Sequence, residues 1–317
     1  FKQKTAYEIP LRLVGSEMCI RDRYMTNLSK VPIYYSLIFM IFFVCFIEGK
    51  PFESKYEPLP SENILISNAN IYDGEGNEFL ETDLLIQDRK VIAIGKDLPI
   101  NNNFKVIDAT NKWVTPGIID IHSHMGVYPA PGVSTSSDGN EATSPVTADV
   151  WAEHSIWVQD PQYALALKGG ITAFHILPGS ANLIGGRGVT VKNIQRNTID
   201  SMKFPDAPHS LKMACGENPK RVYGNRQQAP STRMGNAAGY RKAWIEAEAY
   251  LNRVDEYESK SDEAKEMGYA PQRDLEMETL AGVLRGEILV HNHCYRAEEM
   301  ALSLIHISEP TRRRGIS

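Results

Sequence analysis

The chain has 317 residues, of which 42% are hydrophobic, and its 34 Lys and Arg against 39 Asp and Glu leave a formal net charge of −5 at pH 7. This mildly acidic balance is typical of a soluble globular protein. It excludes a protein that binds nucleic acid through a strongly basic surface.

The two ends of the chain read as one nucleotide cassette translated in opposite orientations. A single DNA sequence encodes LVGSEMCIRDR at 13–23, and its reverse complement encodes LSLIHISEPT from Leu302 onward. The cassette resembles a sequencing adapter, and cloning or processing segments are left out of fold reasoning. We therefore predict that 1–24 and 302–317 are adapter-derived, and that the biological chain starts at Met25 and is cut off near Leu302.

A short apolar segment follows the predicted start. Lys30 precedes the run IYYSLIFMIFFVCFI at 33–47, and a basic residue before a short apolar core is the pattern of a secretory signal peptide. The run is shorter than the roughly 20 residues that a membrane-spanning helix needs. We predict a signal peptide at 25–49 and a secreted or periplasmic protein. Because no clear A-x-A cleavage site is present and Cys45 leaves lipidation open, a retained membrane anchor is the alternative.

The first folded unit, 50–113, is predicted to consist of β-strands. Apolar runs of β type cover 63–71, 83–87, 90–94 and 106–109, and turn signals at 73–74 and 88–90 separate them. The pattern predicts a small β-sandwich-like unit.

The second unit, 114–301, alternates between strand-like and helix-like segments. Its first run, 114–124, is continuously apolar, as expected of a strand buried on both faces of a parallel sheet. Further strands are expected at 171–177, 189–194, 210–214 and 287–293, and helices at 150–168, 240–265 and 275–286. This alternation predicts an α/β fold with a parallel sheet. A complete (β/α)₈ barrel takes about 250 residues, so we expect a partial TIM barrel of about five strands.

Histidines and one lysine stand at the ends of three predicted strands. His122 and His124 close the first strand, in VTPGIIDIHSHMG, and residues at i and i+2 of a strand face the same side. Lys212 lies in SLKMA, and His291 and His293 end the strand EILVHNH. Active sites of such barrels lie at the carboxyl ends of the strands, so these side chains predict one divalent metal site. No C-x-x-C spacing exists, so thiolate ligands are not expected, and whether Cys215 and Cys294 pair stays open.

These residues carry a resemblance to a known family. PGIIDIHSHMG, placed after a small β unit, resembles the opening of the metal-dependent amidohydrolase superfamily, in particular its imidazolonepropionase-like and Xaa-Pro-dipeptidase-like branch. LVHNHCYRAEEM resembles the fifth-strand histidine segment of that branch, and LPGSANLIGGRG and LKMACGENPKRVYG are similar to it as well. The resemblance covers 63–301 and specifies the superfamily much better than the substrate.

The resemblance implies a role for each matching residue. His122 and His124 match ligands of the more buried metal ion, and His293 matches the fifth-strand ligand. Lys212 matches a fourth-strand lysine that many members carry as a carbamate bridging two metal ions, with Glu217 as the alternative ligand. Contacts with the substrate are expected from His291, Arg187, Tyr295, Arg296 and His175.

The implied reaction is hydrolysis of a carbon–nitrogen bond other than a standard peptide bond, in a cyclic amide, an N-acyl compound or a dipeptide. One or two divalent ions, zinc by the donor set, would activate a bound water and polarise the carbon that it attacks. The general-base Asp of the family is expected beyond the break near Leu302, so the fragment itself should be inactive. A non-catalytic ligand-binding barrel and a deaminase on the same metal site are the alternatives. The expected partner is a small-molecule substrate, and a homo-oligomer is left open.

Overall fold

A computed structural model describes residues 53–304 of the chain. The chain divides into two parts between Pro51 and Phe52, and the described residues belong to the second part. The predicted signal peptide, the leading adapter segment and nearly all of the trailing one lie outside the described residues. Within 53–304, no helix combines the length and the apolar character needed to cross a membrane.

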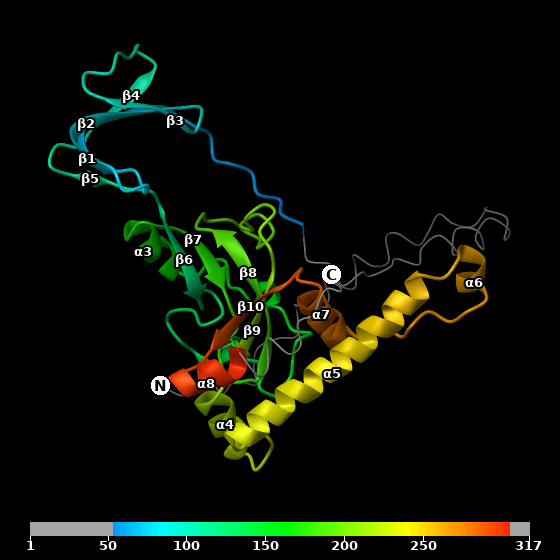
Figure 1. Cartoon of the computed structure of the whole chain (residues 1–317). Helices are drawn as coiled ribbons and strands as arrows, with labels where there is room; N and C mark the ends of the chain where they lie inside the picture. Colours follow the sequence, from blue (N-terminus) through cyan, green and yellow to red (C-terminus); the bar gives the residue numbers. More distant parts are fainter. Residues whose placement is uncertain (1–52, 305–317) are drawn as a thin grey trace, which may run out of the picture. The chain divides into compact units, whose positions relative to one another are not determined.

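The first unit is a single five-stranded sheet (Figure 1). Its strands are β1 (Asn63–Tyr72), β2 (Glu78–Gln87), β3 (Lys90–Gly95), β4 (Phe104–Asp108) and β5 (Trp113–Val114). The order is β3-β2-β1-β4, and β5 also pairs with β1. Because β4 and β5 pair in parallel with successive segments of β1, they extend one sheet. The predicted β strands are therefore present, but the described strands form one layer instead of a sandwich.

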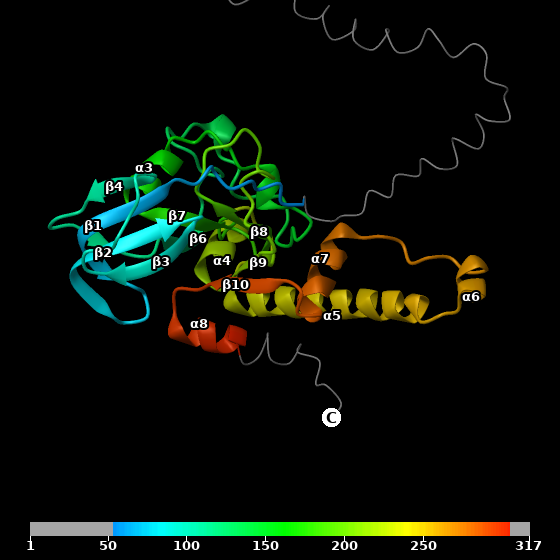
Figure 2. The same ribbon diagram turned by 90° about the horizontal axis from the view of Figure 1, so that it is seen from above.

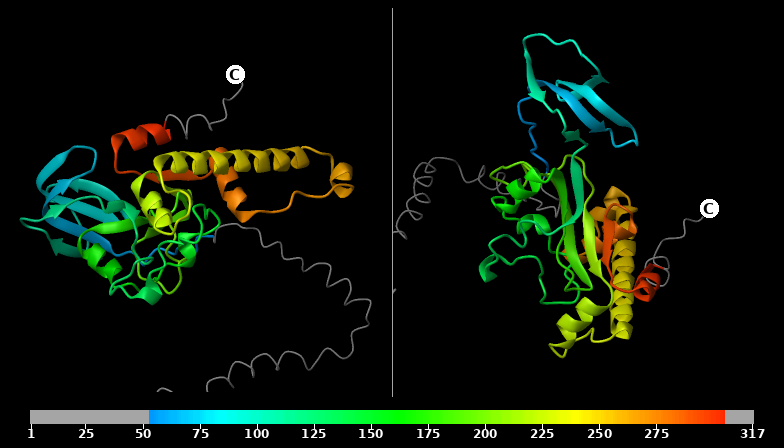
Figure 3. Two further views of the ribbon diagram at one scale, coloured as in Figure 1. Left: turned by 90° about the horizontal axis from the view of Figure 1, so that it is seen from below. Right: turned by 90° about the vertical axis from the view of Figure 1, so that its left-hand side faces the viewer.

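The second unit is built on another five-stranded sheet, which is curled (Figure 3). Its order is β10-β9-β8-β7-β6. The strands are β6 (Ile118–Ser123), β7 (Ile171–Ile176), β8 (Ile184–Lys192), β9 (Ser210–Ala214) and β10 (Leu289–His293). Within the described residues, β6 and β10 each pair with one strand only, so this sheet does not close.

The direction of β8 differs from the prediction of a parallel sheet. β6 pairs in parallel with β7, and β9 with β10, but β8 runs antiparallel to both of its neighbours. Parallel neighbours need a crossover of a dozen or more residues, and only the loop 177–183 joins β7 to β8. The chain therefore reverses, and the glycine-rich segment at 184–188 becomes strand where a loop was expected.

Helices cover one face of the second sheet. Tyr240 and Trp244 of α5 pack with Leu280 of α7 against Leu211 and Met213 of β9 in one buried cluster, and Figures 2 and 3 show α5 and α7 side by side. The helices are α3 (Gln162–Lys168), α4 (Glu217–Gly224), α5 (Arg233–Glu258), α6 (Asp262–Glu266), α7 (Leu275–Leu284) and α8 (Ala297–Ala301), with 3₁₀ turns η2 (Ser134–Ser136) and η3 (Ala152–His154).

Two predicted helices are shorter or interrupted. In 150–168 only α3 and η3 form, because the Asp160 carboxylate accepts backbone hydrogen bonds from Gly126, Ala130 and Gln162 and so holds this segment as a loop. The expected helix at 240–265 is divided into α5 and α6, because the hydroxyl of Ser261 caps a new helix start by accepting from the Ala264 N–H.

Candidate active site

The inner face of the second sheet gathers side chains from four strands. Lys212 of β9 lies in register with His291 of the parallel neighbour β10. The His291 ring stacks on His175 of β7, with ring centroids 4.7 Å apart. The Lys212 Nζ is 2.9 Å from Nε2 of His122 on β6. The predicted strand ends therefore meet in space.

His122 and His124 lie together at the end of β6. Their ring centroids are 5.2 Å apart and nearly perpendicular. Nδ1 of His124 is 2.8 Å from the carbonyl oxygen of Leu177. Because that nitrogen donates to the carbonyl, Nε2 is left with the lone pair that a metal ion binds.

Both histidines are held in the neutral form. Burial, followed by the charge of Lys212, lowers the pKa of His122 to about 4. Burial also lowers the pKa of His124, against a smaller opposite effect of its hydrogen bond to Leu177. Since a metal ion binds neutral imidazole, the pair needs no proton loss near pH 7.

Lys212 is buried to an unusual degree for a lysine, with 1% of its surface exposed. Burial lowers its pKa to about 8. Gly186 of β8 stands opposite it in register and leaves no side chain there, because the Val150 carbonyl lies where a Cβ atom would be. The alternative ligand Glu217 is exposed at the start of α4, and no hydrogen bond or ion pair among residues 53–304 joins it to the histidines. The geometry brings Lys212, and not Glu217, to this group.

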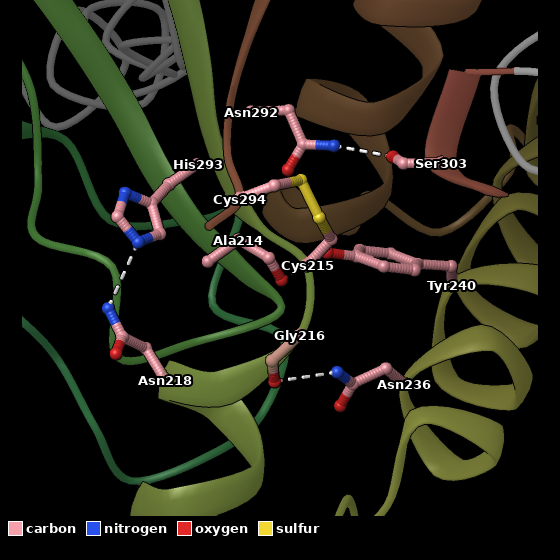
Figure 4. The surroundings of a disulfide bond; sticks show 10 residues. All are labelled: Ala214, Cys215, Gly216, Asn218, Asn236, Tyr240, Asn292, His293, Cys294 and Ser303. Carbon is pink, nitrogen blue, oxygen red and sulfur yellow. Dashed lines mark hydrogen bonds between the residues drawn. A yellow bond between two sulfur atoms is a disulfide. The ribbon is translucent and has the colours of Figure 1, made fainter. Parts of the chain in front are cut away.

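His293 lies at the other side of this group, at the end of β10. Nδ2 of Asn218 is 3.2 Å from Nε2 of His293 (Figure 4). The same Nδ2 is 2.7 Å from the hydroxyl of Ser180. Tyr295 is 58% exposed and places its ring perpendicular to that of His293, at 4.6 Å. Sequence reasoning did not single out Asn218. Its position in the first turn of α4, two residues after the Cys215-Gly216 turn that follows β9, was the available signal.

A disulfide joins the segments that carry these residues. Cys215 and Cys294 directly follow β9 and β10, with Cα atoms 5.1 Å apart, and Figure 4 shows the bond beside His293 and Asn218. The Cys215 N–H also donates to the carbonyl of His293 over 2.7 Å. The sequence left this pairing open, and the structure forms it.

One predicted substrate contact lies on the other face of the sheet. Arg187 pairs in register with Leu211 on the face of the sheet opposite Lys212, where its guanidinium lies 4.4 Å over the Trp151 ring and its Nε donates to Thr279. We therefore do not retain it as a substrate contact.

His175 and Arg296 are occupied by other partners. The two ring nitrogens of His175 lie 2.9 Å from the Thr190 hydroxyl and 2.6 Å from the Ser210 hydroxyl. The exposed Arg296 pairs with Glu298 at 2.5 Å. Of the expected substrate contacts, His291, His175 and Tyr295 lie in or beside the group, but both ring nitrogens of His175 already have hydroxyl partners.

The donor set at these strand ends fits a metal ion in part. Residues 53–304 contain no group of three His, Cys, Asp or Glu side chains arranged to hold one. What the strand ends bring together is the pair His122 and His124 with Lys212 as the third side chain. The two neutral imidazoles fit a divalent ion, and the lysine fits once carboxylation turns its amine into an oxygen donor.

The chain is similar to known amidohydrolases. No family model matches the chain. It is 33% identical over 271 residues to the amidohydrolase tasK of Hapsidospora irregularis, a match that covers 80% of this chain and 27% of that protein. The solved structure of an amidohydrolase from Thermotoga maritima MSB8 superimposes with a TM-score of 0.69 and 37% identity, covering 78% of this chain and 62% of that one. A stretch of 70 residues is 44% identical to the dihydroorotase of Ligilactobacillus salivarius, covering 22% of this chain and 15% of the enzyme. The chain thus spans about a quarter of tasK and under two thirds of the Thermotoga protein.

Proposed function

This chain belongs to the amidohydrolase superfamily, and from that premise we propose that the protein is a metal-dependent hydrolase of a carbon–nitrogen bond other than a standard peptide bond. The substrate is a small molecule of the cyclic amide, N-acyl or dipeptide class. We also propose that the protein is exported. The Cys215–Cys294 disulfide supports export, because disulfides persist in oxidising compartments.

The observation that carries the proposal is the contact between Lys212 and His122. A buried lysine 2.9 Å from an imidazole, with a second oriented imidazole beside it, is costly unless it serves a ligand. His122 and His124 at the end of β6 and Lys212 of β9 thus lie together, with nitrogen atoms, or a carboxylated lysine oxygen, as donors.

Each of these residues has a defined task. His122, His124 and carboxylated Lys212 would hold the metal ion, which when bound activates water and polarises the carbon under attack. The hydrogen bond from His124 to Leu177 fixes which ring nitrogen is available. Asn218 similarly orients His293 at the opposite side.

Zinc binding by the chain tests this proposal. The purified protein is loaded with zinc chloride, desalted and analysed for metal by mass spectrometry. The wild-type chain is expected to retain zinc, and the double variant His122→Ala with His124→Ala is expected to lose it. His154→Ala is the matched control, because this histidine is exposed and lies outside the group.

Either of two results would overturn the ligand assignment. One is an equal amount of retained zinc in the wild type and the double variant, and the other is a wild-type chain that retains no zinc. In the full-length protein, Lys212→Ala should lower hydrolysis of N-acyl amino acids, hydantoin or dihydroorotate, and a small carboxylic acid should restore part of it. Unchanged turnover in that variant would remove Lys212 from the site.

A further inference from the structure

The Cys215–Cys294 disulfide lies where β9 and β10 end together. Ala214 and His293 form the last register pair of this parallel ladder, and the two cysteines are the residues that directly follow. Within residues 53–304, β10 pairs with β9 alone, so His293 has a neighbouring strand on one side only. Because strand ends open locally at little cost in free energy, the disulfide closes this ladder at the point where it would open first.

The two cysteines are anchored in different ways. Cys215 is 5% exposed and packs in the buried cluster that contains Met213 and Tyr240. Cys294 is only partly buried, and it packs against this cluster from the edge strand. One end of the bond is therefore fixed in a closely packed core, and the other end is the residue after His293. The bond ties the end of β10 to the core, whose close packing leaves little room for movement.

Two hydrogen bonds join His293 to the turn that follows β9. The Cys215 N–H donates to its carbonyl oxygen over 2.7 Å, and Nδ2 of Asn218 lies 3.2 Å from its ring nitrogen Nε2 (Figure 4). Gly216, with a φ of +95°, turns the chain between these two partners, and a Cβ atom there would collide with the Glu299 carboxylate. The disulfide spans the same turn and the residue after His293, so it keeps both hydrogen bonds aligned.

Other members of the group are held without this cross-link. Lys212 lies within β9, which has β8 on one side and β10 on the other, and its side chain is 1% exposed. Nδ1 of His124, which follows the opposite edge strand β6, is held 2.8 Å from the carbonyl oxygen of Leu177. Opening the disulfide should therefore loosen His293 and leave Lys212 and His124 in place.

We propose that the Cys215–Cys294 disulfide is a positioning element of the metal site, and that it holds the His293 ring where a metal ion can use it as a ligand. The inference rests on the proposed function for the metal ion and for the role of His293. A ligand that is already held in its binding position loses less conformational freedom when the ion binds. Removing a group that orients a metal ligand costs roughly 10- to 100-fold in metal affinity.

The zinc affinity of the whole chain tests the proposal. The variant Cys215→Ala with Cys294→Ala removes the cross-link and leaves neither thiol of the pair to bind zinc itself. Dissociation constants are measured by competition with a chromophoric chelator, at a temperature where circular dichroism shows every variant folded. We expect the cysteine-free variant to bind zinc roughly 10- to 100-fold more weakly than the wild type.

Glu153→Gln is the control for stability that is lost elsewhere in the fold. It removes one charge of the buried ion pair with Lys203, which is not part of the group, and so lowers stability without touching the disulfide. Its zinc affinity should remain that of the wild type. A loss of affinity as large as that of the cysteine-free variant would overturn the proposal, because reduced stability alone would then explain the effect.

A double-mutant cycle assigns the effect to His293. His293→Ala should weaken zinc binding by itself. Removing the two cysteines from that variant should weaken binding no further, because changes that act through one residue are not additive. Additive losses would overturn the proposal, as would a His293→Ala variant with the zinc affinity of the wild type.

A measurement without metal separates this inference from the proposed function. In the metal-free chain with isotope-labelled histidine, the ring NMR signal of His293 is assigned by its loss in His293→Ala. This signal should shift or broaden when the cysteines are removed, while the signal of His124 stays unchanged. A wild type that shows this difference and binds no zinc refutes the metal site alone. A cysteine-free variant with full zinc affinity and an unchanged His293 signal refutes the positioning role alone.

Discussion

Breaking the Cys215–Cys294 cross-link should lower the stability of the chain substantially. The bond closes a loop with a sequence separation of 79 residues. In the chain-entropy account, closing a loop of this length restricts the unfolded chain and raises the free energy of unfolding by about 4–5 kcal/mol. For a domain of this size, such a loss lowers the melting temperature by roughly 10–20 °C.

Two single variants divide this effect into its parts. Cys294→Ala removes the cross-link and keeps the Cys215 side chain, which is 5% exposed and part of the core beside α5 and α7. Cys215→Ala removes the same cross-link and also a buried sulfur, so it should cost about 1 kcal/mol more. Because neither variant has the cross-link, reductant should leave the unfolding midpoint of each one unchanged.

The assay is guanidinium denaturation followed by circular dichroism, with a thiol count before and after reduction. Reduction should expose two further thiols in the wild type and move its unfolding midpoint to that of Cys294→Ala. A wild type whose midpoint is unaffected by reductant would refute the entropic reasoning. A thiol count that does not rise by two would refute the bond itself.

Two further predictions concern buried charge. Glu153→Gln should cost about 3–5 kcal/mol, because it removes the carboxylate charge that lies 2.7 Å from the almost fully buried ammonium of Lys203; a denaturation midpoint within error of the wild type would contradict this. Acidification from pH 7 to 5 should destabilise the fold, because burial lowers the pKa of His175 and of His209 to about 4. In the unfolded chain these histidines titrate near 6.5, so the unfolded state binds more protons over this range. Each histidine therefore lowers the free energy of unfolding by up to about 1.4 kcal/mol per pH unit. Burial raises the pKa of Glu276 to about 7, so this carboxyl gains protons on folding and opposes the loss of stability. Glu276→Gln should therefore steepen the loss in denaturation series at pH 7, 6 and 5. A wild-type stability that stays constant over this range would argue against the histidine assignments, and equal slopes in the wild type and Glu276→Gln would argue against the Glu276 assignment.

Local patterns in the sequence determined much of this protein. The strand at 210–214 and the starts of the strands at 63 and 90 were predicted at the residues where the structure has them. Side-chain alternation along a strand depends only on neighbouring residues, so the joint projection of His122 and His124 was also readable. The superfamily followed from the same segments, and the comparisons bear it out.

Only the tertiary structure decided what depends on residues far apart in the chain. The reversed direction of β8 follows from how the short loop 177–183 returns the chain, and its direction places Arg187 on the helix-covered face. The disulfide depends on two strand ends that the helices α4 to α7 separate in the chain. A cavity beside His124 likewise needs α4 to lie near the turn after β7, where Asn218 contacts Ser180. A sequence shows which residues have side chains that can bind a ligand. Contacts across the whole fold set the strand directions and the sheet faces, and these decide which of those side chains come together at one site.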